Sequence, residues 1–429
     1  MVDDGTRVSD ENPEILLDAG YTYFGQLLSH DLTKDDSSVD EAWQKEPEQL
    51  QNLQTPKLDL HVLYGGGPDG SPELYEHNGV RLKLGESNAT RPSFDICVAK
   101  NGERVLADDR GAENMVLRQM TAVFARLHNF AVKQFRPVSS SRDALFEQAR
   151  RQTRRQFQYL VVHDYLQSVL DKDVYRKIFI EGKTDIEWDS FSIPIEFSAA
   201  AMRFGHAMVR PNYLFNFGKE MFLQELLGKT TDRGPLQVDQ EISWGLFFQG
   251  AGPEGTVTSR PIDTRLAPAF QHLPADLIGT PQAKCPFARI AGHPSQLAVR
   301  TLLRGAGLRL PSGQTAARVC NQVPLTEQEL TTNSIGDETG QGRILRQAGL
   351  TDETPLWYYI LKESEMRRNG NRLGPVGSYI VGETIHAALR ADPESILNQP
   401  DDCPPTWQLP DGASRIYGFS ELFRLAKLL

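Results

Sequence analysis

The most informative stretch of the chain is GYTYFGQLLSHDLT, residues 20–33. Apolar residues recur around it at helical spacing, so we expect a helix over residues 14–31. Gln26 and His30 lie four residues apart and would share one face of that helix. Asp31 is rotated by about 100° and points elsewhere. A histidine with apolar neighbours is often a satisfied core residue, so this stretch alone leaves both a structural and a reactive role open for His30.

The same helical spacing recurs along the chain, whereas strand patterns are weak. We expect further helices over residues 112–136, 143–171, 194–209, 294–309, 354–366 and 373–391. No composition shift divides the 429 residues. The sequence therefore predicts a mostly α fold with little β structure, arranged as one large domain over residues 1–429 with its core at roughly 10–400.

Composition excludes several classes of protein. Charged residues make up 24%, hydrophobic residues 39%, and the formal net charge is −10, which gives no general attraction for nucleic acid. The basic run formed by Arg150, Arg151, Arg154 and Arg155 alternates with apolar residues, so we interpret it as a solvated helix face rather than a phosphate-binding patch. The four cysteines, Cys97, Cys285, Cys320 and Cys403, are far apart and predict neither a disulfide scaffold nor a zinc site.

The chain shows no targeting or membrane signal. Its acidic, polar N-terminus does not resemble a secretory signal, and no stretch reaches about 18 apolar residues. We expect no membrane span and a cytoplasmic location, unless a precursor segment has been removed.

A second informative stretch is LADDRGAENMVLRQMTAVFARLHNF, residues 106–130. Arg110 and Glu113 stand three residues apart at the mouth of the expected long helix. Arg110 could direct a fixed positive charge into a cavity. Alternatively, Asp108 or Asp109 caps the helix and Arg110 is merely solvated.

A third stretch, FSAAAMRFGHAMVRPNYLF (residues 197–215), places His206 behind alanines and a glycine. Small residues let a helix approach a flat ring closely. The alternative is a histidine in an Ala-rich core helix.

Taken together, the three stretches resemble the motifs of the animal haem peroxidase family, part of the peroxidase–cyclooxygenase superfamily. They follow the family's order with similar separations. The matching residues are Gly25–Leu32, Asp108–Glu113 and Arg203–His206. The C-terminal half resembles the family's bacterial branch, for example through LPSGQ (310–314) and LGPVGSYIVGE (373–383). The resemblance implies a helical fold that holds haem b between distal and proximal helices.

The resemblance also implies a reaction, in which hydrogen peroxide is reduced and a small organic or halide donor is oxidised. His206 would be the axial iron ligand. His30 would move a proton between the peroxide oxygens, because an imidazole can carry it both ways. Arg110 would stabilise the negative charge that develops as the O–O bond breaks, and Gln26 would hold a distal water or halide.

Other haem contacts are implied around the proximal histidine. The family has an Asn that accepts a hydrogen bond from the second ring nitrogen, and Thr301 stands at that position, with Arg304 at a family Arg. A threonine can accept the bond but is shorter. The alternative is that Thr301 bonds its own helix backbone.

Many family members attach haem through esters to an Asp and a Glu. Here Ser29 replaces the Asp and Glu113 matches the Glu, so we expect at most one ester. The sulfonium link of one subfamily is not expected, because Asn114 occupies its Met position.

The family also binds calcium. The matching donors here are Asp31, Thr55, the Lys57 carbonyl and Asp59, although His61 replaces a usual oxygen donor.

Two other functions are compatible with the motifs. Related fatty-acid dioxygenases use a tyrosine three residues before the proximal histidine, and Arg203 occupies that position here, which favours a peroxidase. A haem-binding helical protein without turnover is the third hypothesis, and the presence of both His30 and Arg110 argues against it.

Overall fold

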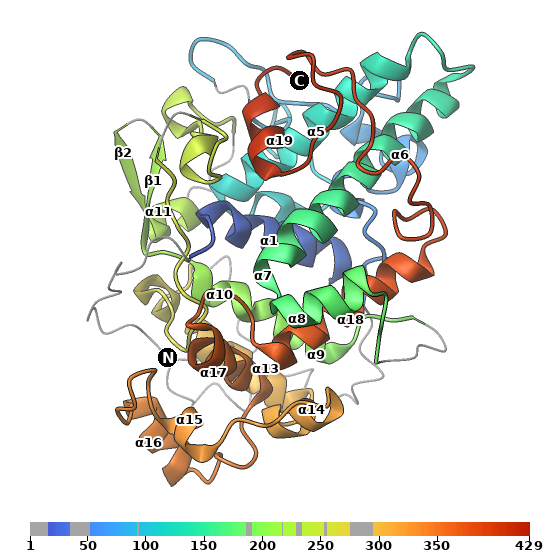
Figure 1. Cartoon of the computed structure of the whole chain (residues 1–429). Helices are drawn as coiled ribbons and strands as arrows, with labels where there is room; N and C mark the ends of the chain where they lie inside the picture. Colours follow the sequence, from blue (N-terminus) through green and yellow to red (C-terminus); the bar gives the residue numbers. More distant parts are fainter. Residues whose placement is uncertain are drawn as a thin grey trace.

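The structure is a computed structural model, and it describes residues 16–34, 52–91, 94–185, 191–216, 218–228, 234–252, 255–274 and 295–429. Within these ranges the prediction of a mostly α fold is confirmed (Figure 1). The one sheet among the described residues has two antiparallel strands, β1 (Asn212–Asn216) and β2 (Lys219–Phe222). The extent of the domain stays a prediction.

Three long helices form the centre of the upper half of the molecule. α1 (Ala19–Leu32) packs against α5 (Met115–Phe135), which packs along α6 (Arg142–Leu160) (Figure 1). Asn114 begins α5 by accepting the Leu117 N–H at 2.8 Å, and Ser141 caps α6 in the same way. These side-chain caps satisfy amide groups that a helix end leaves without partners.

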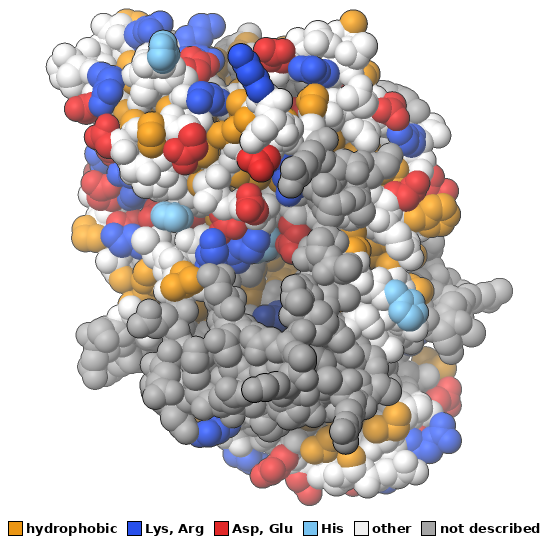
Figure 2. Space-filling model, turned by 180° about the vertical axis from the view of Figure 1, so that it is seen from behind, with side chains coloured by type: hydrophobic (Ala, Val, Ile, Leu, Met, Phe, Trp, Pro, Cys, Tyr) orange, Lys and Arg blue, Asp and Glu red, His pale blue; other side chains and the backbone are white. Residues whose placement is uncertain are grey.

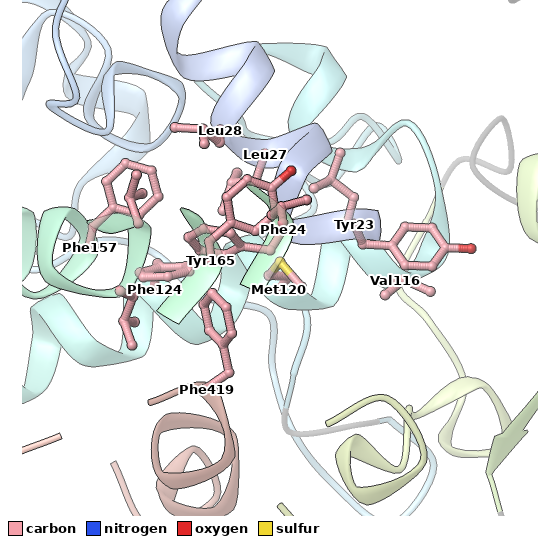
Figure 3. Close-up of a cluster of buried hydrophobic side chains, with 14 of the residues drawn as sticks. Tyr23, Phe24, Leu27, Leu28, Val116, Met120, Phe124, Phe157, Tyr165 and Phe419 are labelled. Atoms are coloured by element: carbon pink, nitrogen blue, oxygen red, sulfur yellow. The ribbon is translucent and has the colours of Figure 1, made fainter. Parts of the chain in front are cut away.

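α1 is held on one face by a cluster of buried hydrophobic side chains, many of them aromatic (Figure 3). The Phe24 ring lies 4.4 Å from that of Phe419 and 5.6 Å from that of Phe157, centroid to centroid. A Cβ on Gly25 would come within 2.2 Å of the Tyr165 hydroxyl. The close approach therefore requires a glycine at this position.

Below α1 in Figure 1, a second group of helices surrounds the segment that carries His206. The single helix expected over residues 194–209 is broken into three short pieces, α9 (Ile195–Ala199), η6 (Ala201–Phe204) and α10 (Gly205–Met208). The break falls at Ala200, whose φ of −131° and ψ of −67° are not helical. α13 (Leu297–Gly307), α17 (Leu356–Arg368) and α18 (Pro375–Ala391) pack around these pieces and lie close to their predicted ranges.

The other helical elements are short. Along the first half of the chain they are α3 (His61–Tyr64), α4 (Gly67–Gly70), η2 (Pro72–Leu74), η3 (Asp109–Ala112), the π-helical η4 (Val161–Leu166), α7 (Gln167–Val169), α8 (Lys172–Tyr175) and the π-helical η5 (Arg176–Ile180). Later come α11 (Leu223–Gly228), η7 (Val238–Gln240), η8 (Trp244–Leu246), η9 (Pro268–Gln271), α14 (Gly313–Val319), α15 (Glu327–Thr331), α16 (Gly340–Gln347) and α19 (Phe419–Leu425). The helix expected over residues 143–171 is thus continuous in space but passes through a π-helical stretch.

The interpretation of the basic run on α6 as a solvated face is wrong for two of its four arginines. Arg154 is 6% exposed and pairs with Asp392 at 3.2 Å. Arg155 is equally buried and donates to the backbone carbonyls of Gln399 and Asp401. Both side chains join α6 to the C-terminal segment, which the local pattern did not indicate.

The visible surface carries charges of both signs among apolar side chains (Figure 2). None of the helices in the described ranges is long and apolar enough to cross a membrane. Cys97, Cys320 and Cys403 are free thiols, and Cys285 lies outside the described residues.

Candidate active site

A connected polar network lies on one face of α1. Gln26 Nε2 donates to Glu113 Oε2 at 2.8 Å, and His30 Nε2 lies 3.5 Å from the same oxygen. Asn114 Nδ2 donates to Gln26 Oε1 at 2.8 Å. The prediction that Gln26 and His30 share a helix face is confirmed, and that face meets the start of α5.

The turn before α5 positions this network. The helix begins at Met115, three residues later than expected, because the 3₁₀ turn η3 and the Asn114 cap come first. Asp108 caps that turn by accepting the Arg110 backbone N–H at 3.0 Å. Asn114 both caps α5 and fixes the Gln26 amide, so the start of the helix is linked to the polar face of α1.

The Arg110 side chain is 28% exposed, and its guanidinium has several hydrogen-bond partners. It forms a two-pronged pair with the Asp108 carboxylate, with its shortest N–O distance at 2.8 Å. It also donates to the backbone carbonyls of Thr33 at 2.8 Å and His30 at 3.1 Å, at the C-terminal end of α1. Burial opposes ionisation of Asp108, but the Arg110 hydrogen bonds and charge hold its pKa at about 2.

The His30 imidazole is neutral in this environment. Burial, and then the positive charge of Arg110, lower its pKa to about 3. The side chain is 9% exposed, and its Nδ1 has no hydrogen-bond partner among the described residues. A neutral imidazole keeps one unprotonated ring nitrogen, which is the atom that accepts a proton in acid–base catalysis.

His206 lies in α10, which packs against α1, and its ring is near two aromatic rings. Its ring centroid is 6.1 Å from that of Trp357 and 6.3 Å from that of Phe270. Burial, and then the charge of Arg203, lower the His206 pKa to about 3. Its Nδ1 is buried and has no hydrogen-bond partner within the described ranges.

Thr301 bonds its own helix. Its hydroxyl donates to the Leu297 carbonyl at 2.9 Å, as the alternative interpretation of this residue states. No bond joins Thr301 to His206 among the described residues. Arg304 is buried on the same helix, and Arg203 Nε donates to the Ser198 carbonyl at 3.1 Å. Their roles as haem contacts stay predictions.

The expected calcium donors are only partly brought together. Asp31 points away from His30, as predicted, and accepts the Leu60 and Val62 amides at 3.0 and 3.4 Å. Burial, and then the nearby charge of Asp59, raise the Asp31 pKa. Thr55 donates to Asp59 at 3.2 Å.

The Lys57 side chain is exposed, so the expected donor at this residue is its carbonyl. The His61 amide donates to Asp59 at 3.1 Å. The described residues contain no group of three His, Cys, Asp or Glu side chains placed for a metal ion. A cation here would need the Thr55 hydroxyl and backbone carbonyls in addition to two carboxylates.

Three site residues were not recognised from the sequence. Two of them, Asp108 and Asn114, lie within the second motif. The sequence shows their positions but not that Asp108 pairs with Arg110 or that Asn114 bonds the Gln26 amide. Trp357 lies in a stretch predicted only to be helical, over residues 354–366, and no local signal links it to His206.

The chemistry of the two histidines fits a haem. His206 is a neutral imidazole, the form that binds iron. A Cβ placed on Gly205 would meet no atom within 4 Å, so there is open space beside the histidine. On the distal side, His30 and Arg110 supply a proton acceptor and a positive charge.

Comparison with known proteins also finds similarity to haem peroxidases. Residues 28–232 match the family model described as animal haem peroxidase, a range that includes His30, Arg110, Glu113 and His206. The peroxidasin homolog pxn-2 of Caenorhabditis elegans is 25% identical over 357 residues, covering 77% of this chain and 25% of that protein. Thyroid peroxidase of Canis lupus familiaris is 24% identical over 376 residues, covering 81% and 38%. The chain thus spans about a quarter to two fifths of these relatives.

Solved structures share the fold. Peroxidase A from Dictyostelium discoideum aligns with a TM-score of 0.61 at 16% identity, over 96% of this chain and 84% of that one. A fatty acid alpha-dioxygenase of Arabidopsis thaliana aligns with a TM-score of 0.63 at 14% identity, over 96% and 70%. Because the two TM-scores are nearly equal, the fold does not choose between their chemistries.

Proposed function

We propose that this chain, whose residues 28–232 match the animal haem peroxidase family model, is a haem peroxidase. It would reduce hydrogen peroxide and oxidise a small organic or halide donor. The observation that carries the proposal is the neutral, buried His30, held between the Arg110–Asp108 pair and the Gln26–Glu113–Asn114 network. A protein that merely stores haem has no use for this arrangement.

His206 would hold the haem b iron through its ring nitrogen. When bound, the haem supplies the redox chemistry toward peroxide. The remaining work belongs to the distal side chains. His30 would accept a proton from peroxide at a ring nitrogen and return it to the departing oxygen.

Arg110 would contribute a permanent positive charge that stabilises the developing negative charge, and Asp108 fixes the direction of the guanidinium. Gln26 presents an amide whose orientation is set at both ends, by Glu113 and by Asn114. The amide can therefore order a water or halide without rearranging.

Two further features belong to the proposal. A single ester to haem would be made through Glu113, since Ser29 has no carboxylate. Calcium would be held by Asp31 and Asp59 with the Thr55 hydroxyl and the Lys57 carbonyl, because a cation offsets the repulsion between the two carboxylates.

Replacement of the proposed proton carrier is the direct test. In the haem-loaded protein, His30→Ala should slow the reaction with hydrogen peroxide by about 10²–10⁴-fold, because acid–base catalysis contributes that much. The matched control is His77→Ala, which removes an exposed histidine and should leave the rate unchanged. An undiminished rate in His30→Ala would remove His30 from the mechanism.

Fatty-acid dioxygenation is the second candidate, favoured by the shared fold. At the position of the catalytic tyrosine in that class stands Arg203, which cannot store a radical. Oxygen uptake that depends on added palmitate, with no response to peroxide, would establish this alternative in place of the peroxidase.

A further inference from the structure

The proximal segment has little helical support of its own. α9 ends at Ala199, Ala200 leaves the helical region, and His206 sits in the four-residue helix α10. A histidine on a long helix is oriented by the hydrogen-bond ladder of that helix. Here the ladder is interrupted six residues before the histidine, so the orientation of the ring depends on contacts from other elements.

Trp357 supplies two such contacts. The side chain lies near the start of α17 and is 2% exposed. Its indole N–H donates to the Arg203 carbonyl at 3.1 Å, three residues before His206. Its ring meets the imidazole edge to face, with an interplanar angle of 78°, a preferred arrangement of aromatic pairs. One side chain therefore fixes both the backbone before the histidine and the plane of its ring.

Phe270 of η9 is a second ring near His206, with an interplanar angle of 56°. The imidazole therefore packs near two rings from distant parts of the chain. Each aromatic contact of this kind is worth about 0.5–1.5 kcal/mol beyond area burial.

Thr301, by contrast, makes no contact with the histidine that would orient it. Its hydroxyl hydrogen is directed to Leu297 in its own helix, and His206 Nδ1 has no acceptor among the described residues. A hydrogen-bond acceptor at this nitrogen would raise the basicity of the ligand. Without one the ligand is a plain neutral imidazole, which stabilises ferric iron less.

We propose that Trp357, and not Thr301, is the positioning residue for His206, and that the proximal ligand works without a hydrogen-bond acceptor. Trp357 therefore determines how firmly the haem is held. With Thr301 at this position, the reduction potential of the haem iron is more positive than it would be with a residue that accepts a hydrogen bond from His206. The proposal rests on the proposed function only in assigning His206 as the iron ligand.

The test compares three variants of the full-length, haem-loaded protein without peroxide. The readouts are the reduction midpoint potential, the iron–imidazole stretching band of the ferrous protein by resonance Raman spectroscopy, and the rate of haem transfer to apomyoglobin. Trp357→Phe keeps an aromatic ring but loses the indole N–H. It should release haem about fivefold faster, the effect of one neutral hydrogen bond of about 1 kcal/mol, and broaden the stretching band.

Substitutions at position 301 give the matched comparison. Thr301→Val removes only the hydroxyl and should change none of the three readouts. Thr301→Asn introduces an acceptor for the His206 N–H. The equilibrium constant for reduction should fall by about fivefold, which lowers the midpoint potential, and the iron–imidazole stretching frequency should rise.

Two results would overturn the proposal: Thr301→Val moving the potential or the stretching band, or Trp357→Phe leaving all readouts at the wild-type value. If Trp357→Phe does not fold, the two Thr301 variants still decide whether an acceptor is present at Nδ1. Since no readout uses peroxide, a protein that ignores peroxide but follows these expectations would refute the proposed function alone. Absence of haem binding would refute both.

Discussion

The surroundings of His30 and His206 differ in what holds each side chain in place. The distal histidine belongs to a network of polar side chains, in which Gln26, Glu113 and Asn114 are joined by hydrogen bonds. The proximal histidine is held by aromatic packing, and no acceptor meets its Nδ1 among the described residues. Both have a pKa lowered to about 3, mainly by burial.

The difference shows that a similar pKa can serve two tasks. On the distal side, the neutral His30 imidazole is surrounded by the charged Arg110 guanidinium and by polar, hydrogen-bonding side chains. On the proximal side, aromatic rings pack near a neutral imidazole that is the proposed iron ligand. The account predicts that distal substitutions change reaction rates while haem stays bound, whereas proximal substitutions change haem retention and the reduction potential.

The largest effect is expected from removal of the proximal ligand. His206→Ala should lose the Soret band of the purified protein, and added imidazole should restore part of it by entering the vacated space beside Gly205. The absorption spectrum at equal haem supply measures both. A normal Soret band in His206→Ala would mean that iron is held elsewhere, and the contrast between the two histidines would fail.

A smaller effect is expected where the distal network is altered indirectly. Asp108→Asn removes the charge that orients Arg110, so the rate with peroxide should fall about tenfold, a loss of roughly 1.4 kcal/mol within the range for charge-assisted hydrogen bonds. The Soret band should remain. Stopped-flow kinetics measure the rate, and haem loss without a rate effect would place Asp108 in the structural scaffold alone.

Calcium removal tests the loop behind the distal helix. A chelator should lower the melting temperature by several degrees, because binding to the folded state alone adds stability by mass action. Asp31→Asn should have a lower melting temperature than wild type in calcium and should no longer respond to the chelator. A wild-type protein with the same melting temperature in calcium and in chelator would exclude a structural calcium ion.

The smallest expected change is the response of the peroxide reaction to pH. With its pKa at about 3, His30 stays unprotonated on lowering the pH from 8 to 5, so the second-order rate should stay level over that range. An ordinary histidine would lose activity below about 6.5. A rate that falls with a midpoint near 6.5 would show that His30 is not shielded as described.

The same shift affects stability with a definite sign. The folded state takes up no proton at His30 above about pH 3, whereas the unfolded chain does so below about 6.5. The free energy of unfolding should therefore fall as the pH is lowered from about 6.5 toward 3, and the fall should be smaller in His30→Gln, in which His206, His128 and His386 still contribute.

Local parts of the site could be predicted from the sequence. The spacing of Gln26 and His30 fixes their common face, and Asp31 on the next position points the other way, toward Leu60 and Val62. The helix ranges were close to those observed because periodicity and caps are local properties.

The contacts that depend on tertiary structure could not be predicted from the sequence. Trp357 lies 151 residues after His206 in the chain, and nothing in its own segment marks the contact. The break at Ala200 was missed because an Ala-rich run favours a continuous helix, and packing overrides that propensity. Arg154 and Arg155 were placed in solvent because their partners lie more than 230 residues away.

The central claim is that the distal side is built for peroxide, and one spectrum tests it most directly. The wild-type protein from haem-supplied cells is mixed with one equivalent of hydrogen peroxide, and its Soret band is followed on the millisecond scale. The account predicts a shift within milliseconds and a return to the starting spectrum on adding a phenolic donor. A haem-loaded protein whose Soret band does not respond to peroxide would contradict it.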